Sequence, residues 1–138
     1  MKTVTNERSA MFALLIAASL LGTMLFVSIV ILPVAFGELT KEVAGKFVRK
    51  LFPVYHIVLF IASQVVGILA FTPHLKPIAF LSGLLFALHF VFLTPAINFA
   101  SDTQNTQRFK NLHRLSVLVH VTVMVLYAFA LCVDACFY

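Results

Sequence analysis

Charged side chains are scarce in this chain of 138 residues, where they make up only 11% of the sequence. Ordinary soluble domains carry about 25% charged residues, so the composition excludes a typical soluble domain. Tryptophan is absent. Phenylalanine and tyrosine must therefore supply the aromatic side chains that membrane proteins place at the lipid–water interface.

The motifs of the common enzyme classes are missing as well. The chain has no Gly-rich nucleotide-binding loop and no His-Glu-x-x-His zinc motif. Its few acidic residues form no pair within the apolar parts of the sequence. These absences exclude a standard hydrolase or kinase and favour a protein that is not an enzyme.

Long apolar stretches fill most of the sequence instead. Hydrophobic residues make up 62% of the chain, and the mean hydropathy is +1.04. A membrane-spanning helix needs about 20 mostly apolar residues, and four stretches reach that length: Ser9–Phe36, Phe52–Phe71, Pro77–Asn98 and Leu115–Phe137. Helices satisfy their own backbone hydrogen bonds in lipid. The sequence therefore predicts an all-α fold, a single four-span transmembrane domain over residues 1–138 whose partner is the lipid bilayer.

The first loop carries its own helical pattern. Leu39, Val43, Phe47 and Leu51 recur at four-residue steps, and the lysines of this segment lie away from that line. Such a pattern is typical of an amphipathic helix. We expect a short interfacial helix here, lying in the headgroup plane before the second span.

Basic residues are unevenly divided between the two ends of the predicted bundle. The first and third loops hold seven of the ten lysines and arginines, and the opposite side holds three. Because basic loops stay in the cytoplasm, we expect both termini outside, in a bacterial cytoplasmic (inner) membrane. The net charge of +5 is thus explained by orientation and by contact with anionic headgroups, without nucleic acid as a partner.

Three histidines lie inside predicted spans. His56 follows the start of the second span by about four residues, His89 precedes the end of the third, and His120 follows the start of the fourth. At 1.5 Å rise per residue, all three lie roughly 6–9 Å below the same membrane face. Ionisable residues within a membrane usually face the bundle interior and are candidates for a functional site.

The fourth span extends this pattern. His113 and His120 are seven residues apart and share one face, with Ser116 between them and Met124 one turn beyond. Histidine and methionine together can ligate haem iron or copper. Three interpretations stay open: neutral histidines hydrogen-bonded within the bundle, a haem or transition-metal site built on the span histidines and Met124, or a relay for protons or ions.

Several short elements resemble one known family. Lys50-Leu51-Phe52-Pro53-Val54-Tyr55 begins the second span, Thr94-Pro95-Ala96-Ile97-Asn98 closes the third, and Leu112-His113-Arg114-Leu115-Ser116 begins the fourth. Together they resemble the domain of unknown function 4149 family, whose animal relatives are the transmembrane-protein-205-like proteins. The resemblance covers about residues 37–131.

The resemblance implies a four-span membrane protein without an established reaction, distantly similar to membrane families linked to copper uptake or haem synthesis. The positions that it carries over include Tyr55, Asn98, His113 and Ser116, which join the histidine layer as candidate pocket residues. We therefore expect a polar pocket near the cytoplasmic face that handles a metal or small solute. The alternatives are a haem-binding electron-transfer protein and an accessory or scaffold subunit that contacts other membrane-protein subunits.

Overall fold

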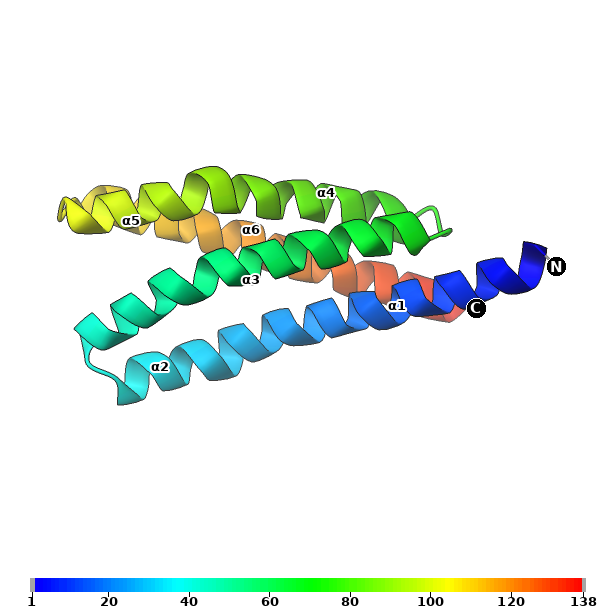
Figure 1. The fold of residues 1–138 in the computed structure, drawn as a ribbon, viewed down its shortest axis with the longest axis horizontal. Coiled ribbons are helices and arrows are strands. Elements are labelled where there is room, and N and C mark those ends of the chain that lie inside the picture. Colours follow the sequence, from blue (N-terminus) through cyan, green and yellow to red (C-terminus); the bar gives the residue numbers. More distant parts are fainter. Residues whose placement is uncertain (1, 138) are drawn as a thin grey trace.

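Four long helical rods lie side by side in the computed structural model, which describes residues 2–137 (Figure 1). Rod 1 runs through α1, η1 and α2, rod 2 is α3, rod 3 runs through α4, η2 and α5, and rod 4 is α6. The bounds are α1 Lys2–Phe26, η1 Val27–Ile31, α2 Leu32–Glu38, α3 Lys41–Leu69, α4 Leu75–Leu88, η2 His89–Leu93, α5 Thr94–Asp102 and α6 Thr106–Phe137. The chain enters and leaves the bundle at the same end (Figure 1).

Each rod is long and apolar enough to cross a membrane. The candidate spans are Asn6–Glu38, Lys41–Leu69, Leu75–Asp102 and Thr106–Asp134. Large apolar side chains cover the outside of the bundle, and Ile68 is 69% exposed. An outward apolar surface of this kind is stable only against lipid. The predicted all-α membrane bundle with four spans is confirmed, and the described residues contain no strand.

Two π-helical turns interrupt rods 1 and 3, and each precedes a proline. Leu32 donates its backbone N–H to Val27, and Thr94 donates to His89, so both bonds span five residues instead of four. Pro33 and Pro95 come next. A proline ring clashes with the carbonyl four residues earlier, and the wider π turn moves that carbonyl aside. The second π turn begins at a histidine of the predicted layer.

The predicted interfacial helix is not a separate element. Residues from Lys41 onward form the first turns of α3, which continues through Pro53 to Leu69. The Thr40 side chain caps this helix by accepting the N–H of Val43 at 3.5 Å. Proline removes only one donor, and spanning helices tolerate it where their neighbours support the backbone. The segment predicted to be helical over Leu39–Leu51 is helical from Lys41 onward, but it is continuous with the second span and does not form a separate helix.

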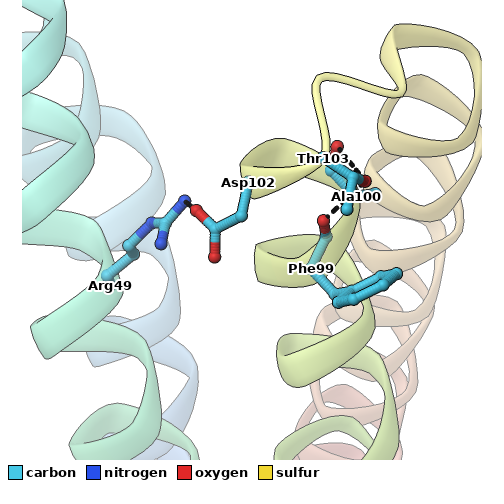
Figure 2. Close-up of polar contacts among 5 residues, drawn as sticks. All are labelled: Arg49, Phe99, Ala100, Asp102 and Thr103. Atoms are coloured by element: carbon cyan, nitrogen blue, oxygen red, sulfur yellow. Dashed lines mark hydrogen bonds and ion pairs between the residues drawn. The ribbon is translucent and has the colours of Figure 1, made fainter.

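An ion pair ties the start of α3 to the end of α5. Arg49 Nη2 donates to Asp102 Oδ1 at 2.5 Å (Figure 2). Next to it, the Thr103 hydroxyl donates to the carbonyl of Phe99 at 2.9 Å and closes the last turn of α5. Only residues 103–105 then separate α5 from α6. This end of the bundle is therefore held by short turns and a cross-helix pair.

Polar contacts also cross the bundle at mid-height and at the other end. Tyr127 Oη donates to Ser63 Oγ at 2.9 Å, and both residues are fully buried. At the far end, Thr72 Oγ1 donates to Asp134 Oδ2 at 2.8 Å and accepts the backbone N–H of Leu75. These bonds fix α6 against α3 and against the turn before α4. They hold the helices in register beneath the histidine layer.

Candidate functional site

The histidines of the predicted layer meet inside the bundle. His56 comes from α3 and His89 from η2, and they are only 2% and 4% exposed. Their rings stack with centroids 4.1 Å apart and planes 24° from parallel. Phe52, one turn before His56, stacks on the other side of that ring at 5.7 Å. A Phe–His–His stack therefore joins α3 to η2.

Two hydroxyl–imidazole contacts connect α3 and η2 to α6. Tyr55 Oη lies 3.2 Å from His120 Nε2, and Ser116 Oγ lies 2.9 Å from His89 Nε2. A neutral imidazole has one donor and one acceptor nitrogen, and a hydroxyl can serve either one. Hydrogen bonds and ring stacking together link five residues from three rods: Tyr55, His56, His89, Ser116 and His120. Below, we call these five residues the histidine network.

One polar atom of the network has no partner. His56 Nδ1 is buried and makes no hydrogen bond with any described residue. A buried polar atom left unpaired costs about 1–3 kcal/mol, and such atoms in native proteins often mark functional sites or bound water. The network is thus not saturated by the protein's own groups.

A cavity of about 370 Å³ lies against the network, between rod 1, α3 and α6. Its lining is half polar and half apolar. The polar lining residues are Ser28, Tyr55, His56, His89, His113, Ser116 and His120, and the apolar ones are Val27, Leu32, Phe36, Phe52, Val117, Val121 and Met124. Phe36 and Val121 are 57% and 48% exposed on the outside of the bundle. The cavity therefore opens sideways, toward the surrounding lipid.

Most of the sequence-predicted candidates meet at this cavity. Six of the seven pocket residues line it, and so does Met124. Asn98 does not, because it lies in a separate groove with Pro53, Thr94 and Asp102. Asn98 follows His89 by nine residues across the π turn, and its groove lies between α5 and Pro53 of α3.

The geometry does not suit the predicted metal site. No group of three or more His, Cys, Asp or Glu side chains among the described residues could hold an ion. His56 and His89 present ring faces to each other, whereas a metal binds the in-plane lone pair of nitrogen at about 2.0–2.1 Å. Two rings in stacking contact also leave no space for a macrocycle between them. This pair therefore cannot act as the two axial ligands of one haem.

Some lining residues were not predicted. Phe52 carried a usable signal, because it precedes His56 by one helical turn and such pairs share a face. Ser28 and Phe36 carried none, because the first span is apolar all round and its sequence does not show which face turns inward. Their place in the cavity follows from the packing of rod 1 against α6.

The profile of the family described as Domain of unknown function (DUF4149) matches residues 15–133 of the chain. The chain belongs to this family. The match extends from the first span into the last and confirms the resemblance found in the sequence elements. No curated protein and no solved structure matches the chain. The family description names no reaction, so the function has to be argued from the cavity.

Proposed function

We propose that the protein binds a small, lipid-soluble molecule with hydrogen-bonding groups in the histidine cavity. The observation that carries this proposal is the mixed lining of the cavity, which combines polar side chains with an equal number of apolar ones. Ligand pockets typically combine an apolar lining with a few well-placed polar groups. The exposed rim at Phe36 and Val121 gives such a molecule a route from the bilayer without passing through water.

The histidine network is suited to orient a ligand. Its hydroxyl–imidazole pairs at 2.9 Å and 3.2 Å hold the rings in fixed positions. Neutral imidazoles and hydroxyls can each donate and accept a hydrogen bond. The polar side chains of the cavity can therefore bind a ligand hydroxyl or carbonyl. Phe52 and Phe36 provide flat apolar surfaces for the body of a ring-containing molecule.

We place this cavity on the cytoplasmic side of the membrane. Seven basic residues lie at this end of the bundle, in the first turns of α3 and α6, and three lie at the other end. Basic residues close to the ends of spans favour the cytoplasmic face. In this orientation both termini lie on the opposite side of a bacterial inner membrane.

Ligand binding is tested with 2-naphthol and protein reconstituted in lipid nanodiscs. The chain has no tryptophan, so naphthalene fluorescence can be followed above the tyrosine background. We expect saturable binding. Val121→Phe, which places a ring in the rim of the cavity, should weaken it at least tenfold.

The matched control is Val125→Phe. Val125 lies on the same helix, is 61% exposed and does not line the cavity, so the variant should bind like the wild type. A signal that does not saturate, or that is equal in both variants, would mean partition into lipid only and would refute the proposal.

A further inference from the structure

We propose that the histidine cavity takes an organic anion with an apolar body together with one proton, which is held by an imidazole of the cavity. This inference rests on the proposed binding function and names the class of ligand. It goes beyond that function because it couples binding to proton uptake.

The charges that line the cavity carry the argument. Its titratable groups are Tyr55 and His56 from α3, His89 from η2, and His113 and His120 from α6. Rod 1 contributes only the Ser28 hydroxyl as a polar side chain, and no Asp, Glu, Lys or Arg lines the space. A bound cation would meet no carboxylate, and a bound anion would meet no permanent positive charge.

An unpaired charge within a membrane bundle is costly. Histidine is the side chain that most readily gains a proton near neutral pH. An anion that binds with a proton on one imidazole is neutral overall, and the two charges lie within one cavity. A bound cation cannot be neutralised in this way, because no carboxylate lines the cavity. The lining therefore favours neutral ligands and anions over cations.

The hydrogen bonds of the network can adapt to this proton. Both nitrogens of a protonated imidazole donate. The hydroxyls of Tyr55 and Ser116, which face Nε2 of His120 and His89, have oxygen lone pairs and can accept after a rotation about the C–O bond. The ring gains a charge without losing its partner, so protonation requires no rearrangement of the helices.

The surroundings of the cavity favour the approach of an anion and a proton. The helix ends at this side of the bundle hold seven basic and three acidic residues, a net charge of +4. A positive end of this kind raises the local concentration of anions. His113 is exposed at the end of the cavity, two turns from His120 on the same face of α6. It connects the network to the water phase.

Three naphthalene probes test the inference on protein in nanodiscs: neutral 2-naphthol, the permanent anion 2-naphthalenesulfonate, and a permanently cationic naphthyl trimethylammonium. A sulfonate stays ionised, so any proton taken up must reside on the protein. Calorimetry at one pH in two buffers with different ionisation enthalpies counts the protons. We expect naphthol and the sulfonate to bind, the cation not to bind, and the sulfonate to take up one proton.

Proton linkage also predicts that sulfonate affinity falls by about tenfold between pH 7 and pH 8, while naphthol affinity stays constant. Val121→Phe serves as the blank for partition into lipid. If naphthol binds but the sulfonate does not, or binds without a proton, or if the cation binds equally well, this inference is wrong and the binding function stands. If none of the three probes binds, the binding function fails as well.

Discussion

Gly83 of α4 packs directly against Gln64 and Ser63 of α3, and its replacement by alanine is the sharpest test of the packing beneath the cavity. A Cβ atom at this position would lie 2.0 Å from Gln64 Nε2, 3.1 Å from Gln64 Cδ and 3.6 Å from Ser63 Cβ. The first distance is a steric clash. Gln64 must therefore leave the helix interface, or the helices must separate.

Two opposing terms set the magnitude. Overpacking of a well-packed interface costs about 1–3 kcal/mol, and alanine is favoured over glycine within a helix by about 0.5–1 kcal/mol. We therefore expect Gly83→Ala to reduce the free energy of unfolding by up to about 2.5 kcal/mol. Gly22→Ala is the matched control, because no atom lies within 4 Å of its Cβ position, and it should stabilise the protein by about 0.5–1 kcal/mol.

Equilibrium unfolding in mixed detergent micelles measures both variants. The double variant Gly83→Ala/Gln64→Ala removes the clashing amide and should recover most of the loss, so that the two positions show a non-additive interaction. If Gly83→Ala is as stable as Gly22→Ala, or if removal of the Gln64 side chain gives no recovery, the packing of α3 against α4 described here is wrong.

Three further predictions concern single contacts and orientation. Ser116→Ala removes the hydroxyl that pairs with the His89 imidazole and should lower the free energy of unfolding by about 0.6 kcal/mol, with about 1.7 kcal/mol as an upper limit. An unchanged unfolding midpoint would contradict the Ser116–His89 hydrogen bond. Asp134→Leu leaves the Thr72 hydroxyl without its acceptor and should destabilise the bundle, whereas Asp134→Asn keeps an acceptor and should unfold close to the wild type. Single cysteines at Thr40 and Asn105, in a background with both native cysteines replaced by serine, should resist an impermeant thiol reagent in intact cells, and labelling of both from outside would reverse the orientation.

The number and length of the helices were predictable because the bilayer sets them. A span must be about 20 apolar residues long, and four stretches of the chain meet that condition. The depth of His56, His89 and His120 followed from the constant rise of a helix. Counting residues from each end was enough to place three imidazoles in one layer.

Rotation about the helix axes was harder to predict. Spans that are apolar all round give little periodic signal for the inward face, so Asn98 was expected beside the histidines although it lies in a separate groove. The π turns before Pro33 and Pro95 change this rotation further. A proline alone does not show which backbone bond of a span lengthens.

The prediction of a separate interfacial helix before the second span was wrong for a different reason. The amphipathic pattern of Leu39–Leu51 favoured a separate interfacial helix. The structure continues the helix through Pro53, and Arg49 within the segment pairs with Asp102 of α5. That partner lies 53 residues away in the sequence, so no local pattern predicts it.

The contact between the His56 and His89 rings tests the central claim most directly. Nuclear Overhauser spectra of micelle-solubilised protein, protonated only at histidine and tyrosine rings, report ring pairs at short distance. With centroids 4.1 Å apart for His56–His89 and 5.8 Å for Tyr55–His120, we expect a strong cross-peak for the first pair and a weaker one for the second. Cross-peaks from His56 to detergent chains, with none to His89, would contradict a shared histidine cavity.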